Sequence, residues 1–190
     1  MENQIKILLV GDAKVGKTKL ACAIHKRSYE EHLAKHDVNC ISSKYKYHDS
    51  AYSIHTCEMD IKQGTLISND FDCVFLCVNW NEKKSIEKLL KIKDALAQKM
   101  NKKPLFFLMC CKIDVLFSLS PNECRNLLKD LKSNLSKVTL PVFLTSAQTD
   151  FNIKETINIL IDHIINKIPI PVTLDQMIND FQKSEGIPNF

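Results

Sequence analysis

The chain has 190 residues, of which 45% are hydrophobic and 25% charged, a composition that suits one globular domain with a full core. Its net charge of +4 is small and scattered, so nucleic acid is not an expected partner. No apolar stretch is long enough to cross a bilayer. Met1-Glu2 lacks the glycine that myristoylation needs, and the last cysteine is Cys124, so we expect no intrinsic lipid anchor.

The eight cysteines suggest a disulfide scaffold at first sight, but most of them lie inside apolar runs, as Cys73 and Cys77 do. Buried free thiols behave as small hydrophobic side chains. No pair has the spacing of a zinc site, and the N-terminus lacks the pattern of a secretory signal. We therefore predict a reducing compartment and a cytoplasmic protein, with any membrane recruitment left to a partner.

The N-terminal part of the chain predicts a strand, a helix and a hairpin. Ile5 to Val10 is a short apolar run that stops at a glycine, as a buried central strand does before a tight turn. A helix is expected from Lys17 to about His32. After a polar connection, strands are predicted at Lys44 to Tyr47 and at Tyr52 to Met59, joined by a turn at His48-Asp49-Ser50.

From residue 72 onward, predicted strands and helices alternate. The strands are Val74 to Val78, Leu105 to Cys111 and Pro141 to Thr145; the helices are Ser85 to Met100, one that opens at Ser120-Pro-Asn-Glu123, and Ile153 to Lys167. Ser120 at the cap with Glu123 three residues later forms a capping box. The alternation predicts an α/β fold with a mostly parallel six-stranded sheet and helices on both faces. This domain spans residues 1–168, and residues 169–190 are expected to be a C-terminal tail.

A phosphate-binding motif lies between the first strand and the first helix. It reads Gly11-Asp12-Ala13-Lys14-Val15-Gly16-Lys17-Thr18 and matches the P-loop pattern at every required position. Backbone N–H groups would hold the phosphates, Lys17 would reach the outer phosphates, and the Thr18 hydroxyl would bind Mg²⁺. Two of the four glycines in the chain stand where the motif needs them. A strand-turn-helix junction that merely needs flexible residues is the alternative.

With its elements in this order, the chain resembles the Ras superfamily of small GTPases, most nearly the Rab and Rho branches. The resemblance implies a Ras-like G domain of the P-loop NTPase class that binds GTP or GDP with Mg²⁺ and meets protein effectors or regulators. The family reads guanine with an Asn-Lys-x-Asp segment, and Cys111-Lys112-Ile113-Asp114 stands in that place. Asp114 would accept hydrogen bonds from guanine N1 and N2, and the Lys112 stem would cover one face of the base. Cys111 departs from the family asparagine, which implies reduced affinity.

A second base segment of the family, Ser-Ala-Lys, appears as Ser146-Ala147-Gln148. The resemblance implies that the backbone N–H of Ala147 faces the guanine carbonyl, so the change at Gln148 removes little. For Asp114 alone, a turn residue after a strand is the alternative interpretation. Together with the P-loop, the two segments favour guanine over adenine.

The family also has a threonine that binds Mg²⁺ and senses the terminal phosphate. Its nearest counterpart is Ser43, which lies farther from Thr18 than the family spacing, and Ser42 competes for the role. Two solvated loop serines are the equal alternative.

A further family segment reads Asp-x-x-Gly followed by a glutamine that orients the attacking water. The chain offers Asp60-Ile-Lys-Gln-Gly64-Thr65, with Gln63 before the glycine rather than after it. Gln63 is therefore a weak catalytic candidate. The segment from Thr65 to Phe71 is short, which predicts a shortened switch II region and weak or absent GTP hydrolysis.

Three functions follow, in order of preference. The first is a GTP/GDP-binding regulatory protein with weak hydrolysis, and the second is a pseudo-GTPase that serves as a protein-interaction scaffold. The third is an ATP-using P-loop kinase, which Asp114 and the scarcity of arginines disfavour. His25, His32 and His36 recur at helical spacings, but a solvated helix face is preferred over a metal site.

Overall fold

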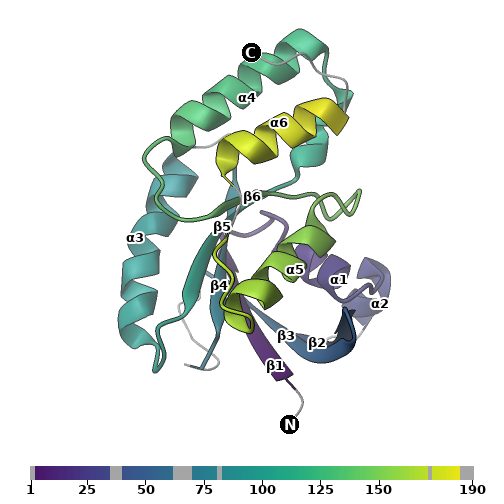
Figure 1. Cartoon of the computed structure of the whole chain (residues 1–190). Coiled ribbons are helices and arrows are strands. Elements are labelled where there is room, and N and C mark those ends of the chain that lie inside the picture. Colours follow the sequence, from purple (N-terminus) through teal and green to yellow (C-terminus); the bar gives the residue numbers. More distant parts are fainter. Residues whose placement is uncertain (1–2, 35–39, 62–69, 81–82, 171–172, 185–190) are drawn as a thin grey trace.

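Six strands form one sheet in the order β2-β3-β1-β4-β5-β6 (Figure 1). The computed structural model describes residues 3–34, 40–61, 70–80, 83–170 and 173–184. The strands are β1 (Asn3–Gly11), β2 (Cys40–Tyr47), β3 (Ser50–Asp60), β4 (Cys73–Asn79), β5 (Leu105–Cys111) and β6 (Val142–Leu144). Every neighbouring pair is parallel except β2 and β3, which form an antiparallel hairpin at the sheet edge. The predicted α/β class and mostly parallel sheet are confirmed.

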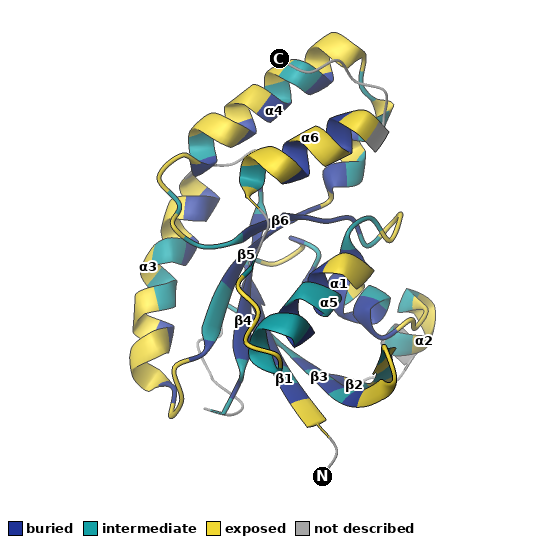
Figure 2. Cartoon of the chain, in the orientation of Figure 1, coloured by how far each residue is buried: buried dark blue, intermediate teal, exposed yellow. Residues whose placement is uncertain are grey.

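The sheet centre is the core of the domain. Strand β4 is buried over nearly its whole length and β1 from Ile7 to Gly11, as expected for parallel strands covered on both faces (Figure 2). Rings of Phe75, Phe107 and Phe143 run across β4, β5 and β6, with successive centroids 5.7 and 5.6 Å apart. The loop after β1 therefore leaves from a rigid base.

Helices cover both faces of the sheet (Figure 1). They are α1 (Lys17–Ile24), α2 (Tyr29–Ala34), α3 (Lys83–Lys99), α4 (Pro121–Leu135), α5 (Ile153–Ile164) and α6 (Leu174–Ser184), with a 3₁₀ turn η1 (Ile113–Ser118) after β5. Helix α1 packs on β1, β3 and α5, while α3 packs on β4 from the opposite face. The capping box predicted for α4 is present, because Ser120 and Glu123 bond each other's backbone N–H.

The expected single helix from Lys17 to His32 is wrong. Helix α1 ends at Ile24, and Lys26 adopts a left-handed φ of 50° that the helix cannot continue through. A new helix then starts, because the Ser28 hydroxyl accepts a hydrogen bond of 3.0 Å from the Glu31 backbone N–H. Ser28 followed three residues later by Glu31 is a helix-start pattern that was available in the sequence.

The segment 169–190, expected as a tail, contains a packed helix. In α6, Met177, Ile178 and Phe181 are buried, and the helix contacts β6 and α4. The apolar residues from Leu174 to Phe181 recur at helical spacing, which is the sequence signal for this helix. The end of the chain is therefore part of the domain as far as residue 184.

Two cysteines differ from the expectation of free thiols. Cys40 and Cys57 form a disulfide, because the antiparallel register of β2 and β3 places them directly opposite each other. The other six cysteines are free and buried, as predicted, and burial raises the pKa of the Cys73 and Cys110 thiols.

Within the described ranges, no helix has the length and apolar character that a bilayer span requires.

Candidate functional site

The turn between β1 and α1 has a shape that only its glycines allow. Gly16 has a φ of 117°, in the left-handed region, and forms the N-cap of α1. A Cβ on Gly11 would lie 2.5 Å from the backbone oxygen of Cys77. The loop is thus pressed against β4 and directs the N-terminus of α1 at the space above the strand ends, as an anion site requires.

Two lysines fix this loop. The buried Lys17 donates from Nζ to the backbone oxygens of Gly11 (2.9 Å) and Asp12 (2.8 Å), which compensates its charge. Lys88 of α3 forms an ion pair with the Asp12 carboxylate. Lys17 therefore lies curled over the P-loop, where a bound phosphate would offer it stronger acceptors than carbonyls.

Thr18 meets a carboxylate that the sequence reasoning missed. Its hydroxyl donates to Glu58 Oε2 at 2.8 Å. Burial raises the pKa of the Glu58 carboxyl, while the Thr18 hydrogen bond and the nearby Lys17 oppose the rise. Asp60, the carboxylate taken from the family pattern, lies two residues later, paired in register with Gly11. A charged residue inside an otherwise half-buried strand was the available signal for Glu58.

These oxygens suit a hard cation. Thr18 and Glu58 together supply hydroxyl and carboxylate donors beside the P-loop, and Mg²⁺ is usually held by one or two such groups plus phosphate oxygens and water. Among the described residues no group of three or more His, Cys, Asp or Glu side chains gathers as a dedicated metal cage. The donor set therefore fits a cation that arrives with a phosphate ligand.

The two predicted base segments lie side by side. The Ser146 hydroxyl donates to Asp114 Oδ1 at 2.6 Å and accepts from the Gln148 backbone N–H at 3.1 Å. The Ile113 backbone N–H donates to the Thr145 oxygen at 3.2 Å. One side chain, Ser146, thus orients the carboxylate and shapes the loop that contains Ala147.

Cys111 replaces the family asparagine, and the neighbouring Lys112 provides the link between the base segment and the P-loop. The Cys111 thiol is buried and directed at the Met109 oxygen, so it makes no tie to the P-loop. Lys112 makes that tie instead, because its Nζ donates to the Lys14 backbone oxygen at 2.7 Å. The base segment and the phosphate loop are therefore joined, although the family asparagine is absent.

One cavity of about 350 Å³ joins the phosphate loop and the two base segments. Its lining includes P-loop residues, both base segments and Tyr29, a residue the sequence reasoning did not select: Lys14, Gly16, Lys17, Thr18, Lys19, Leu20, Tyr29, Cys111, Lys112, Asp114, Thr145, Ala147 and Gln148. Lys19 Nζ lies 5.7 Å from the centroid of the Tyr29 ring. Four lysines against a single carboxylate make the cavity electropositive, which favours a polyphosphate.

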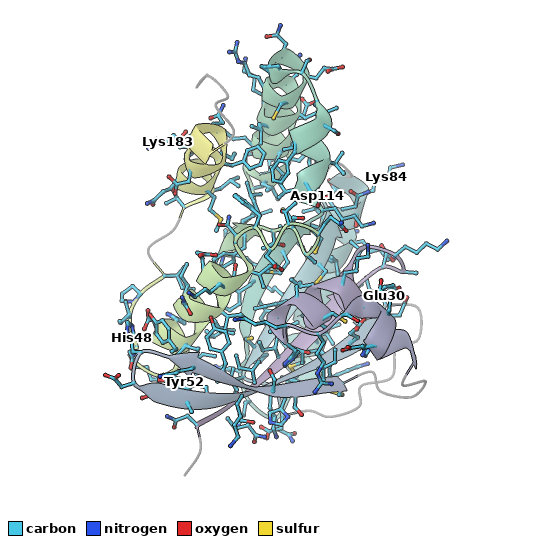
Figure 3. All side chains as sticks on the ribbon, turned by 90° about the vertical axis from the view of Figure 1, so that its right-hand side faces the viewer. Glu30, His48, Tyr52, Lys84, Asp114 and Lys183 are labelled. Atoms are coloured by element: carbon cyan, nitrogen blue, oxygen red, sulfur yellow. A yellow bond between two sulfur atoms is a disulfide. The ribbon has the colours of Figure 1, made fainter. Side chains whose placement is uncertain are left out.

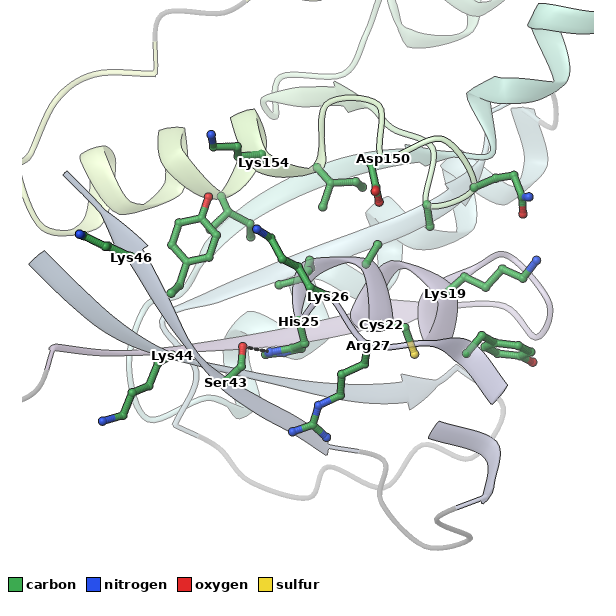
Figure 4. A pocket seen from close by; sticks show the side chains of 18 of the residues that line it. Lys19, Cys22, His25, Lys26, Arg27, Ser43, Lys44, Lys46, Asp150 and Lys154 are labelled. Carbon is green, nitrogen blue, oxygen red and sulfur yellow. Dashed lines mark hydrogen bonds between the residues drawn. The ribbon is translucent and has the colours of Figure 1, made fainter. Parts of the chain in front are cut away.

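Ser43 lies elsewhere. It lines a second cavity of about 1090 Å³ between α1, β2 and α5 (Figure 4). There its hydroxyl is hydrogen-bonded to His25 Nδ1 at 2.6 Å rather than brought to Thr18. The rim of this cavity is basic, with Lys19, Lys26, Arg27, Lys44, Lys46 and Lys154 against Glu30 and Asp150. The structure therefore separates the two predicted metal ligands.

The prediction that His25 lies on a solvated helix face is wrong, because the side chain is buried. Its Nε2 is hydrogen-bonded to Thr56 Oγ1 at 2.9 Å, opposite the bond to Ser43. Burial lowers the pKa of His25 to about 4, with Arg27 and His55 adding to the effect. The neutral ring is a polar link between α1, β2 and β3. His32 lies in α2, and His36 falls outside the described residues.

The catalytic candidate cannot be placed. Gln63, Gly64 and Thr65 lie outside the described residues, as does most of the short segment before Phe71.

A comparison with protein families agrees with this geometry. The sequence model of the Ras family matches residues 6–166, which include β1, the P-loop and both base segments. No curated protein matches the chain at a significant level. With its six-stranded sheet and its phosphate loop joined to the base segments, the chain belongs to the Ras family and is a GTP-binding protein of the small-GTPase type.

Proposed function

We propose that the protein is a guanine-nucleotide-binding regulator that holds GTP or GDP with Mg²⁺ and hydrolyses GTP weakly or not at all. The observation that carries the proposal is the single cavity in which the P-loop, Asp114 and Ala147 meet. Such convergence of distant segments on one electropositive cavity favours a ligand with both a polyphosphate and a base.

The roles follow from the geometry. Lys17 exchanges its bonds to loop carbonyls for bonds to phosphate oxygens, which are stronger because both partners are charged. Thr18 and Glu58 would hold Mg²⁺, which neutralises phosphate charge when bound. Asp114, oriented by Ser146, accepts from the guanine N1 and N2 donors.

Guanine is preferred over adenine because adenine offers Asp114 no matching pair of donors. With adenine bound, Asp114 would keep its bond from Ser146 but would gain no donor from the base, a loss of about 1–3 kcal/mol in binding free energy. Ala147 and Gln148 border the same cavity, and the backbone N–H of Ala147 would face the guanine carbonyl.

Weak hydrolysis is proposed from the sequence of the segment after β3. The family glutamine that orients the attacking water is absent after Gly64, and Gln63 precedes that glycine. Ser43, the candidate sensor of the terminal phosphate, is bonded to His25 instead. Neither group that couples hydrolysis to shape change stands in its family place.

Two measurements test the proposal. Mass analysis of the nucleotide released from the purified protein should find GDP or GTP, and a thermal shift should follow addition of either with Mg²⁺. Phosphate release under multiple turnover should be slower than about 4 × 10⁻⁴ s⁻¹, the unassisted rate typical of the family. Faster turnover contradicts the second half of the proposal, and absence of any guanine nucleotide contradicts the first.

A scaffold that has lost switching is the second candidate. It is favoured by Cys111, whose thiol bonds to Met109 rather than to the P-loop, and by the engagement of Ser43 with His25. Backbone hydrogen exchange separates the two. A regulator that presents its state to protein effectors changes protection in β2 and α2 between GDP and a GTP analogue, whereas a scaffold does not.

A further inference from the structure

Helix α6 contacts the two base segments through one aromatic ring. Phe181 is fully buried, its ring stacks on Phe117 with centroids 5.5 Å apart, and it meets Phe151 edge-on at 5.6 Å. Phe117 and Phe151 also touch edge-on at 6.2 Å. The three rings form a closed cluster, which we call the aromatic clamp. Figure 3 shows Lys183 of α6 at the same end of the molecule as Asp114, far from His48 and Tyr52.

Each of the other two rings lies a few residues after a base segment. Phe117 lies in η1, the same short turn that contains Asp114. Phe151 is paired in a β-bridge with Ser146, whose backbone N–H donates to the Phe151 oxygen at 3.2 Å. Phe181 therefore touches both loops immediately behind the residues directed at the nucleotide.

The two base segments need such support because they contain little regular structure of their own. Lys112 adopts a left-handed φ of 62°, and the segment around Ser146 is a series of turns. The Ser146 hydroxyl bond to Asp114 joins the segments on the pocket side. The aromatic clamp joins them on the opposite side, and two points of attachment fix their relative orientation better than one.

Helix α6 is itself anchored away from the clamp. Met177 and Ile178 are buried, and the helix contacts β6 and α4. Thr173 accepts a hydrogen bond of 3.2 Å from the Gln176 backbone N–H, and Lys132 of α4 pairs with Asp175 at 2.7 Å. Phe181 is thus held by a helix that does not depend on the base segments.

We propose that α6 is a positioning element for guanine recognition and that Phe181 is its key residue. The clamp keeps Asp114 and Ala147 directed at the same base, so displacement of α6 weakens binding of guanine without removing the phosphate site. The inference rests on the proposed nucleotide binding and adds a determinant of base selectivity that lies outside the P-loop and the two base segments.

The test compares Phe181→Ala with Ile178→Ala, which removes a buried apolar side chain from the same helix but leaves the three rings in place. The ligands are GDP and inosine diphosphate, which lacks the 2-amino donor and so reports on Asp114. Urea unfolding gives the stability of each variant. We expect the GDP preference over inosine diphosphate to fall about tenfold in Phe181→Ala, the size of one hydrogen bond from the 2-amino group to Asp114, and to change less than about twofold in Ile178→Ala.

Equal losses of preference in both variants would overturn the proposal, because α6 would then act only through overall stability. An unchanged preference in Phe181→Ala also overturns it, while leaving nucleotide binding intact. Failure of the unaltered protein to bind GDP refutes the proposed function and this inference together. If Phe181→Ala does not fold, the milder Phe181→Leu should give an intermediate preference, and an unaltered preference there contradicts the clamp.

Discussion

The nucleotide cavity and the neighbouring basic cavity share a wall of four residues, Lys19, Tyr29, Ala147 and Gln148, yet they are organised differently. In the first, the polar side chains of Lys17, Thr18 and Asp114 are held by hydrogen bonds within the site. In the second, the candidate sensor Ser43 is held by a buried histidine. Under the proposed function, holding a nucleotide and sensing its terminal phosphate would therefore depend on different parts of the structure.

The largest effect is expected at Lys17. Lys17→Ala should lower GDP affinity about a thousandfold, because two or more charge-assisted bonds to phosphate are lost. The check is a fluorescence titration with a labelled GDP. Lys19→Ala is the control, since Lys19 borders the same cavity but is exposed, and it should cost less than about threefold. Equal losses at both positions would show that general positive charge, not the P-loop geometry, binds the phosphates.

Asp114 tests the base side of the same cavity. Asp114→Asn should lower affinity for guanine nucleotides about a hundredfold and raise affinity for xanthine nucleotides, whose 2-carbonyl accepts from the new amide. Competition between GDP and xanthosine diphosphate measures the shift. Asp150→Asn, an exposed carboxylate in a nearby loop, should leave the preference unchanged. A variant that loses all nucleotides equally would place Asp114 in folding rather than in base recognition.

The buried His25 in the basic cavity should make the stability of the protein depend on pH. Its pKa is lowered to about 4 in the folded state by burial, below the ordinary value of 6.5, so the unfolded chain binds the extra proton first. The free energy of unfolding therefore keeps its full value above pH 6.5. It decreases as the pH falls toward 4, by up to about 3 kcal/mol. Urea unfolding at pH 7 and pH 5 measures the loss. His25→Gln should flatten this slope, whereas the exposed His48→Asn should not.

The smallest effect is expected at Glu58, the proposed magnesium ligand beside Thr18 in the nucleotide site. Glu58→Gln should weaken the increase in GDP affinity that Mg²⁺ produces by about tenfold, because an amide oxygen is a poorer ligand than a carboxylate. The measurement is GDP affinity with and without Mg²⁺. Glu155→Gln, at an exposed position of α5, is the control. An unchanged Mg²⁺ effect in Glu58→Gln would contradict Glu58 as a magnesium ligand and favour Asp60 in its place.

Local sequence determined much of the phosphate half of the site. The P-loop spacing, the strand before it and the capping box of α4 depend on neighbouring residues, whose preferences act over a few positions. The same holds for the sheet: apolar runs separated by helical patterns give parallel strands, and the β2–β3 hairpin follows from its polar turn. The division between α1 and α2 is local too, because Ser28 caps the second helix.

Tertiary structure alone decided which distant groups meet. Glu58 reaches Thr18 because the parallel register of β1 and β3 brings that strand end beside the P-loop. Ser43 faces His25 because the hairpin lies against the end of α1. Pairings of this kind join residues tens of positions apart, and no local preference encodes them.

The C-terminal helix is the clearest case of both contributions. The helical spacing of Leu174, Met177, Ile178 and Phe181 determined that an amphipathic helix forms there. Where its apolar face lies was decided by the fold, because the helix packs on β6 and α4 and places Phe181 against Phe117 and Phe151. An apolar face has no preferred partner until the rest of the chain has formed one, and here that partner includes the two loops that contain Phe117 and Phe151.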